Sequence, residues 1–425
     1  MLTLPTSEEW ASRCARDGEF NQAARHWEGG VCLNIGDEVR QIAVRDGVVS
    51  AGAAAASESV VTYSGSKEVW ARVLTAHPPR FHNDLMANVS AGEGLWRHAS
   101  EVVHAQYYAA VMRAIELLRP ESSASHPLRV GDVGEAGRFD TPVGRYVHLE
   151  LGGLDHRLYY EEAGQGIPLL LQHTAGCHGS QWRHLFENRD ITDRFRLIAY
   201  DLPYHGKSLP PVEQSWWAQP YALQGDFLRS IPLKLAAALN LNNPVFMGCS
   251  VGGLLALDLA HKHADIFSAV ISIEGALNIE GSVSQLSTLW HPQVSNEYKA
   301  RLMEGLMAPG SPQAYRKETS FVYANGWPPV FLGDLHYYME EYDLRACANE
   351  INTDEIGVHI LSGEYDYSGT SELGQAAHQA IAGSTWSEMA GVGHFPMSEN
   401  PAVFIHYLLP VLEQIAQSEA QRGGV

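Results

Sequence analysis

The sequence predicts an α/β fold: a mostly parallel β-sheet with helices on both faces and a helical lid insertion, preceded by a small α+β domain. From Pro142 onward, short β-rich runs alternate with segments of helical length, which is typical of a parallel sheet covered by helices. Before about residue 120, strand-like runs come first and helical patterns follow, the order of a separate α+β unit. At 425 residues, 45% of them hydrophobic, the chain is long enough for both.

Changes of composition along the chain predict its division into domains. We expect a small domain over residues 1–120, a linker rich in Ser, Pro, Gly and charged residues over 121–141, and a core formed by 142–275 and 356–417. Residues 276–355 break the strand–helix alternation and are dense in Trp, Tyr and Phe. Because loops of this length inside a compact domain are usually functional, we expect a lid; an inert helical insertion is the alternative.

The small domain is predicted from three strand-like runs and two helical patterns. Two runs of rough alternation lie within residues 30–52, with turn dipeptides between and after them, and "SVVTYSG" (59–65) is the third. Helical patterns follow at 66–77 and 96–120, the second of which stops at a proline. This order predicts a compact α+β unit.

Eight short β-rich runs are the expected strands of the core. The first two, 144–153 and 156–164, look like a hairpin. The other six are 167–173, 195–202, 244–250, 267–275, 357–363 and 385–391. Since helix-length segments separate most of them, we expect these strands to be mostly parallel.

Charge and composition exclude several classes of partner. The formal net charge is −20, from 49 acidic and 29 basic residues without one long acidic run, so nucleic acid and anionic membranes are poor partners. The N-terminus lacks the pattern of a secretory signal, and no run reaches the about 18 apolar residues of a spanning helix, so we expect a cytoplasmic protein without a membrane segment. Five scattered cysteines without a C-x-x-C spacing predict reduced thiols, and no histidine spacing predicts a metal site.

One serine is flanked by glycines where a strand gives way to a helix. Ser250 stands in "GCSVGG", after the apolar "PVFM" and before the helical "LLALDLA". A serine hydroxyl is a weak nucleophile at neutral pH, and an enzyme that uses one presents it to a histidine base beside backbone N–H groups. Glycines two residues before and after it remove side chains that would collide in such a tight turn. The pattern therefore predicts a nucleophilic Ser250; a helix-capping serine is the alternative.

Around this serine the sequence resembles the α/β-hydrolase family, over roughly residues 146–415. Five motifs stand in the family's chain order: "LLLQHTAG" (169–176), "YDLPYHGKS" (200–208), "GCSVGG" (248–253), "LSGEYDYS" (361–368) and "GVGHFPMSENP" (391–401). The resemblance implies a serine hydrolase whose nucleophile, acid and base follow one another in that order. It implies no cofactor.

The last two motifs contain the preferred candidates for the general base and for the acid that supports it. His394 lies in the glycine-flanked turn "GVGHFP" after a strand, where an imidazole can reach inward over the edge of the sheet. Asp366 ends the preceding strand, and a carboxylate there would hold one imidazole tautomer. Some members of the family carry their acid one strand earlier, where this chain has Glu274. Asp366 is the preferred acid and Glu274 the alternative.

The resemblance also implies an oxyanion hole and a substrate site. One donor is expected to be the N–H of Val251, directly after the nucleophile. The other is expected in the loop after "LLLQH", where Thr174 stands in place of the family's usual glycine, so Ala175 is preferred and Thr174 is the departure. His173 is expected to hydrogen-bond to this loop without titrating. The residues expected to bind substrate are Trp290, Trp327, Phe331, Tyr338 and Cys249.

The implied reaction is cleavage of a carboxylic ester or lactone through an acyl-enzyme. An aromatic-rich lid favours an apolar or aromatic small molecule as the substrate. Hydrolytic carbon–carbon cleavage of a diketone-like compound is the alternative within the fold, and a non-catalytic ligand-binding protein is the alternative outside enzymes. The segment from Gly18 to Glu101 also resembles sterol-carrier-protein type domains, which implies a role in ligand binding, in covering the site or in homodimer formation.

Overall fold

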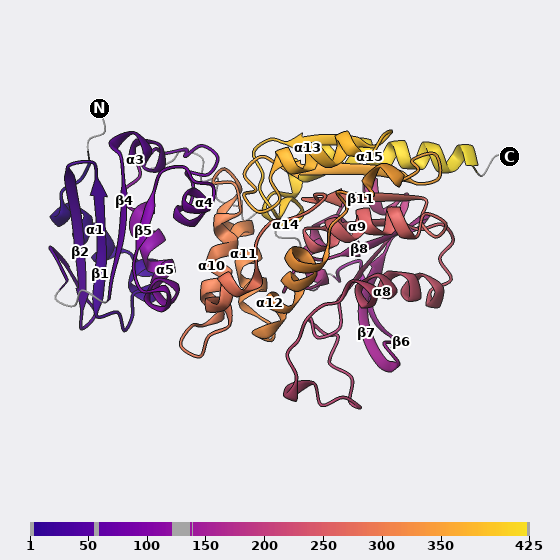
Figure 1. Cartoon of the computed structure of the whole chain (residues 1–425), viewed down its shortest axis with the longest axis horizontal. Helices are drawn as coiled ribbons and strands as arrows, with labels where there is room; N and C mark the ends of the chain where they lie inside the picture. The colour runs from indigo at the N-terminus through magenta and orange to yellow at the C-terminus, as the bar shows by residue number, and fades with distance from the viewer. Residues whose placement is uncertain (1–3, 55–58, 121–136, 138, 423–425) are drawn as a thin grey trace. The chain divides into compact units, whose positions relative to one another are not determined.

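The computed structural model describes residues 4–54, 59–120, 137 and 139–422 (Figure 1). Its contacts divide the chain into two compact units, residues 1–126 with 288–310 and residues 127–287 with 311–425. The predicted linker 121–141 lies largely outside the described residues. The predicted insertion 276–355 is shared between the units, because residues 288–310 belong to the first.

The first unit is a five-stranded sheet with helices. Its strands are ordered β3-β2-β1-β4-β5, and β1 pairs antiparallel with β2 and parallel with β4. The strands are β1 (Gly29–Ile35), β2 (Glu38–Arg45), β3 (Val48–Ala51), β4 (Val60–Gly65) and β5 (Trp96–His98). The helices are α1 (Ser7–Arg16), α2 (Gly18–Ala23), α3 (Lys67–Val73), α4 (Leu85–Ser90), α5 (Glu101–Glu116) and α10 (Asn296–Gly305). The small predicted α+β domain is confirmed, whereas β3, β5, α1, α2 and α4 were not predicted.

Helix α10 joins the first unit through buried polar contacts. The side-chain amide of Asn83 donates to the carbonyl oxygens of Gly305 and Met307 at 3.1 and 3.2 Å. The Arg301 guanidinium lies 3.0 Å from the Glu116 carboxylate on α5. Because a buried charge is stable only when it is paired, these contacts fix the helix to the unit.

The second unit contains an eight-stranded sheet, ordered β13-β12-β11-β10-β8-β9-β7-β6 (Figure 1). Strands β8 to β13 run parallel, and the hairpin β6–β7 joins them antiparallel at one edge. The strands are β6 (Val143–Leu151), β7 (Leu154–Ala163), β8 (Ile167–Gln172), β9 (Phe195–Tyr200), β10 (Val245–Cys249), β11 (Ala269–Ile273), β12 (Gly357–Gly363) and β13 (Thr385–Met389). All eight predicted strands are present.

Helices follow the strands of this sheet and form the insertion. Those of the core are η3 (Gly179–Trp182), α6 (Arg183–Phe186), α7 (Arg189–Thr192), η4 (Trp216–Ala218), α8 (Gly225–Ala238), α9 (Val251–Lys262), α13 (Ser371–Ala380), α14 (Pro396–Glu399) and α15 (Pro401–Arg422). The helices between β11 and β12, apart from α10, are η5 (Val283–Trp290), α11 (Gln313–Ala324), α12 (Pro329–His336), η6 (Tyr337–Glu341) and η7 (Ala348–Glu350). In the part of the chain that is described, no helix combines the length and apolar character that a bilayer crossing requires.

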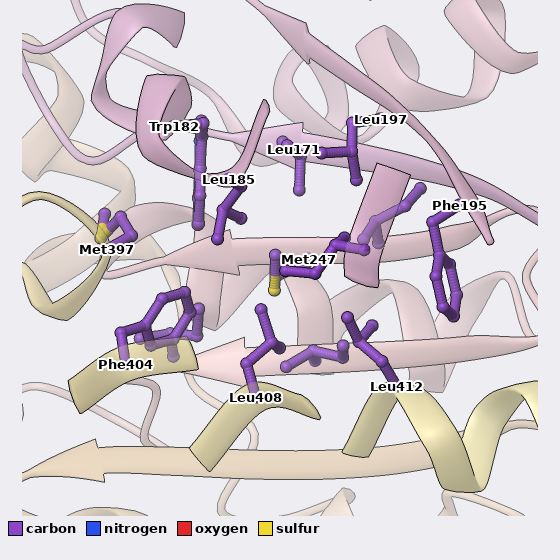
Figure 2. Close-up of a cluster of buried hydrophobic side chains, with 14 of the residues drawn as sticks. Leu171, Trp182, Leu185, Phe195, Leu197, Met247, Met397, Phe404, Leu408 and Leu412 are labelled. Carbon is purple, nitrogen blue, oxygen red and sulfur yellow. The ribbon is translucent and has the colours of Figure 1, made fainter. Parts of the chain in front are cut away.

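A buried hydrophobic cluster fixes one face of the sheet (Figure 2). Leu171 and Met247 come from two neighbouring strands and meet Leu408 and Leu412, one turn apart on α15. Alternate residues of a strand point to the same face, so the apolar side chains of β8 and β10 stack on this helix. The carboxyl ends of the parallel strands are thereby held in register, and the candidate site residues follow those ends.

Candidate active site

Ser250 occupies a tight turn between β10 and α9. Its backbone has φ 60° and ψ −115°, a left-handed conformation that non-glycine residues rarely adopt. The Ser250 N–H donates to the carbonyl of Ile273 at the end of β11, 2.9 Å away. A strained residue held by its surroundings is characteristic of functional turns.

The flanking glycines are required by close backbone contacts. A Cβ atom on Gly248 would lie 2.4 Å from the carbonyl oxygen of Gly252, and one on Gly252 would lie 2.9 Å from that of Gln172. Both distances are shorter than a carbon–oxygen contact, so a side chain at either position would push the turn open. The sequence argument for the glycines agrees with this geometry.

His394 and Asp366 lie together at the carboxyl ends of the last strands. The Nδ1 atom of His394 is 2.6 Å from Oδ2 of Asp366, and Asp366 is fully buried. The Asp366 carboxylate also accepts the N–H groups of Ser368 and Gly369 at 2.7 and 3.0 Å. With Nδ1 donating to this carboxylate, Nε2 is the ring nitrogen left to accept a proton.

Glu274, the alternative acid, lies beside Asp366 and does not replace it. It follows β11 with φ 52°, and both of its carboxyl oxygens accept the N–H of Gly363, at 2.8 and 2.9 Å. Its side chain is fully buried, as is that of Asp366. Burial, and next the negative charge of Asp366, raise the pKa of Glu274 well above its ordinary value.

The loop after β8 is held by side-chain hydrogen bonds. The Thr174 N–H donates to the side-chain oxygen of Gln181 at 3.2 Å, and the Thr174 hydroxyl contacts Gln181 and the Tyr323 hydroxyl. The Thr174 N–H therefore already has an acceptor within the protein, which favours the preferred candidate, Ala175, as the second oxyanion donor. Ala175 remains, since within the described residues its N–H donates to no protein atom.

His173 has a structural place in this loop. Its Nε2 accepts the N–H of Leu202 at 3.1 Å, and its Nδ1 lies 2.8 Å from the carbonyl oxygen of Thr174. Burial, and then the neighbouring His205, hold the pKa of His173 well below its ordinary value. The expectation that His173 bonds to the loop is confirmed.

Two insertion residues lie against the parts of the site. The Tyr338 hydroxyl lies 3.1 Å from the hydroxyl of Ser368, two residues after Asp366. Phe331 packs on the loop after β8 so closely that a Cβ atom on Gly176 would lie 2.8 Å from its ring. Both side chains are buried. Of the predicted substrate-binding residues, these two stand next to the candidate catalytic groups.

Of the other three predicted substrate-binding residues, two lie elsewhere, and Cys249 is buried directly before Ser250 with its thiol 3.2 Å from the His394 carbonyl oxygen. Trp290 is exposed and belongs to the first unit. Trp327 lines a cavity of about 310 Å³ with Tyr204, Trp216 and Tyr221, and Ser250 is not among the lining residues. Cys249 is part of the buried hydrophobic cluster, because it shares a strand face with Met247. Aromatic content alone could not assign these residues to one site.

Two buried carboxylates that the sequence did not single out hold the site loops. Glu399 accepts the N–H groups of Gly393 and Phe395 at 2.8 and 3.2 Å and so fixes the turn that carries His394. Asp334 on α12 accepts the N–H of Gly176 at 2.7 Å. Glu399 stands within the quoted motif "GVGHFPMSENP", which is a signal for it, whereas nothing in the local sequence marks Asp334.

Comparison with known proteins agrees with this architecture. A sequence model of the alpha/beta hydrolase family matches residues 169–406. This chain belongs to the alpha/beta hydrolase family. The pimeloyl-[acyl-carrier protein] methyl ester esterase of Vibrio vulnificus (strain YJ016) is 24% identical to this hydrolase over 265 residues, which cover 59% of this chain and 96% of the relative.

Solved structures share the fold of this alpha/beta hydrolase. An esterase from Thermogutta terrifontis superposes with a TM-score of 0.56 at 18% identity, over 64% of this chain and 99% of that one. The enol-lactonase from Burkholderia xenovorans LB400 superposes with a TM-score of 0.51 at 22% identity, over 63% of this chain and 100% of that one. At these identities the likeness establishes the fold.

The chemistry available to this hydrolase follows from its polar groups. A hydroxyl, an imidazole with a free nitrogen and a buried carboxylate are the groups of nucleophilic acyl transfer. Among the described residues, no group of three or more His, Cys, Asp and Glu side chains is arranged to hold a metal ion.

Proposed function

We propose that this protein is a serine hydrolase that cleaves a carboxylic ester or lactone of an apolar small molecule. Ser250 is the nucleophile, His394 the general base and Asp366 the acid that orients the base. The observation that supports this most strongly is the 2.6 Å contact between His394 Nδ1 and Asp366 Oδ2. It leaves Nε2 of His394 as the proton acceptor for a serine hydroxyl.

In the proposed reaction Ser250 Oγ forms a bond to the carbonyl carbon and its proton passes to His394 Nε2. The tetrahedral intermediate collapses, the bond to the alcohol oxygen breaks, and His394 gives its proton to that oxygen. Water then attacks the acyl-enzyme, again losing a proton to His394, and the acid leaves as Ser250 is reprotonated. Asp366 stays ionised and stabilises the imidazolium in both halves.

Two backbone N–H groups are proposed to bind the developing oxyanion. Val251 is the first residue of α9, and the first N–H groups of a helix have no partner within it. Ala175 supplies the second donor from the loop after β8. Removing one such donor typically costs about 3 kcal/mol of transition-state stabilisation. The positive end of the α9 dipole lies at the same place and favours negative charge.

The substrate class is proposed from the walls of the site. Phe331 and Tyr338 are buried aromatic residues that come from the insertion, and they favour an apolar acyl or alcohol group. The Vibrio vulnificus relative is named for a methyl ester of an acyl chain, which agrees with an ester of this kind. We propose that residues 276–355 act as the lid, apart from those that belong to the first unit.

The experiment that tests this function is a substrate panel on the full chain. p-Nitrophenyl acetate and butyrate, an aryl ester, a lactone and a vinylogous diketone are compared for the wild type and Ser250→Ala. Ester or lactone turnover that Ser250→Ala abolishes supports the proposal. Equal slow rates for both proteins would overturn it in favour of a binding protein, and turnover of the diketone alone would favour carbon–carbon hydrolysis.

A further inference from the structure

The two carboxyl groups that the sequence offered as alternatives form one buried pair. Glu274 leaves the end of β11 and Asp366 follows β12, the neighbouring strand of the sheet. Both side chains are completely buried, and the two residues are neighbours: a Cβ atom on Gly369 would lie 2.7 Å from the Glu274 carbonyl oxygen and 3.2 Å from Oδ2 of Asp366. Two carboxyl groups can share a hydrogen bond only when one of them carries a proton, because an ionised carboxylate can only accept.

The surroundings decide which partner is ionised. Asp366 accepts three N–H donors, from Ser368, Gly369 and His394. Glu274 has the single N–H of Gly363, shared between its two oxygens. Hydrogen-bond donors stabilise the charged form of a carboxyl group, so the negative charge is on Asp366 and the proton on Glu274. Two adjacent buried carboxylates would repel each other without solvent to screen them.

We infer that Glu274 is a protonated positioning residue that donates its carboxyl proton to Asp366 and thereby holds the acid that orients His394. The inference rests on the proposed function for its catalytic consequence. The bond from Glu274 adds a fourth donor to the Asp366 carboxylate and ties the acid loop to β11. The left-handed backbone at Glu274, with φ 52°, aims the side chain across to the neighbouring strand.

The other ionisable groups around Glu274 favour its neutral form. Cys249, from β10, is a buried thiol whose pKa is raised chiefly by burial. Glu399, from α14, adds negative charge and is held by the N–H groups of Gly393 and Phe395 and by the Ser311 hydroxyl. His394 faces Asp366 and not Glu274 in the hydrogen-bond network. Burial, followed by the Asp366 charge, raises the pKa of Glu274 well above 4.5.

The test compares Glu274→Gln, Glu274→Ala and a matched control, Glu364→Gln. Glutamine keeps a donor for Asp366 and an acceptor for Gly363 but cannot ionise, whereas alanine removes both bonds. Glu364 lies two residues from Asp366, is half-buried and accepts the N–H of Gly391, so Glu364→Gln makes the same substitution nearby without touching the pair.

The first readouts do not depend on activity. The infrared spectrum at pH 7 should contain the carbonyl band of a protonated carboxylic acid, which Glu274→Gln abolishes and Glu364→Gln retains. A carboxyl group that is protonated when folded but ionises when unfolded lowers the free energy of unfolding as the pH rises above 4.5. The melting temperature of Glu274→Gln should therefore rise relative to the wild type from pH 5 to pH 8, with no such trend for Glu364→Gln. An unchanged spectrum with parallel melting curves would overturn the inference.

The last readout is kinetic. With p-nitrophenyl butyrate, Glu274→Gln should keep kcat within a few-fold of the wild type, and Glu274→Ala should lose kcat by about 10-fold or more with little change in KM. If Glu274→Gln loses as much kcat as Asp366→Asn, Glu274 is the ionised acid itself and the inference is wrong. If the protein has no Ser250-dependent activity, the proposed function fails, while the infrared and melting measurements still decide the protonation of the pair.

Discussion

The backbone N–H of Gly176 donates to Oδ2 of Asp334 at 2.7 Å, which ties the loop after β8 to helix α12 of the insertion. The same carboxylate oxygen accepts from His205 Nε2 at 2.8 Å, and Oδ1 accepts the Tyr221 hydroxyl at 3.0 Å. One buried aspartate thus joins the proposed oxyanion loop to two other segments of the second unit. A carboxylate with three donors at full burial is costly to remove, because each donor would lose its partner.

Removing the Asp334 carboxylate should disturb catalysis through the Gly176 loop. Asp334→Ala leaves the Gly176 N–H without its acceptor, so the neighbouring Ala175 donor loses its fixed position. A misplacement of about 1 Å can reduce a rate by about 100-fold, and we expect kcat to fall by about 10- to 100-fold with a smaller change in KM. Esterase kinetics measure this, with Asp343→Ala, a half-exposed carboxylate of the same insertion, as the control. Equal kcat for Asp334→Ala and the wild type would contradict it.

The His205–Asp334 pair should make stability depend on pH. Burial opposes the charged imidazolium, but the Asp334 carboxylate outweighs it and raises the pKa of His205 above 6.5. A raised histidine pKa stabilises the folded state below pH 6.5, and that contribution is lost as the pH rises through the folded-state value. The melting temperature of His205→Gln should therefore lie furthest below the wild type at pH 5 to 6 and approach it in alkaline buffer. A constant difference across pH would refute this.

Replacing the Asp366 carboxylate by an amide should disrupt the base while keeping its shape. An asparagine can present an N–H to Nδ1 of His394, which favours the tautomer whose Nε2 carries the proton. In a comparable serine enzyme this change lowers kcat by about 10⁴-fold, and we expect a loss of about 10³- to 10⁴-fold here. The double variant with His394→Ala should lose little more, because the two residues act as one unit. Additive losses in the kinetic assay would argue against the pairing.

Gly248 should not tolerate a side chain. A Cβ atom there would lie 2.4 Å from the Gly252 carbonyl oxygen, so Gly248→Ala must open the turn that holds Ser250. We expect the free energy of unfolding to fall by about 1–3 kcal/mol, the usual cost of overpacking. Urea denaturation measures it. Gly18→Ala serves as the control, since a Cβ at Gly18 would have no atom within 4 Å.

Local patterns in the sequence predicted the framework of the fold and the turn at Ser250. The eight strands of the second unit alternate with helical segments, and that periodicity is local. The glycines around Ser250 are likewise close together in the chain, so their spacing alone predicts a single backbone turn. Strand β5, at Trp96–His98, is too short for any periodicity and was included in a predicted helical segment.

Relationships that depend on packing could not be predicted. Glu274 and Asp366 each fit the position of a triad acid in the sequence, and only the folded chain places both buried side chains side by side. The aromatic residues of the insertion were treated as one group, yet Trp327 faces a separate cavity and Trp290 belongs to the first unit. Composition identifies which residues are apolar but not where their side chains point, so it could not assign these aromatic residues to different sites.

Labelling with a fluorophosphonate probe tests the central claim most directly. The probe reacts with a serine only when a base activates its hydroxyl, and peptide mass spectrometry of the modified chain locates the adduct. We predict a single adduct on Ser250 in the wild type and a greatly slowed reaction in His394→Ala. Well-folded wild-type protein that remains unlabelled at Ser250, or that is labelled equally fast without the His394 imidazole, would contradict the account.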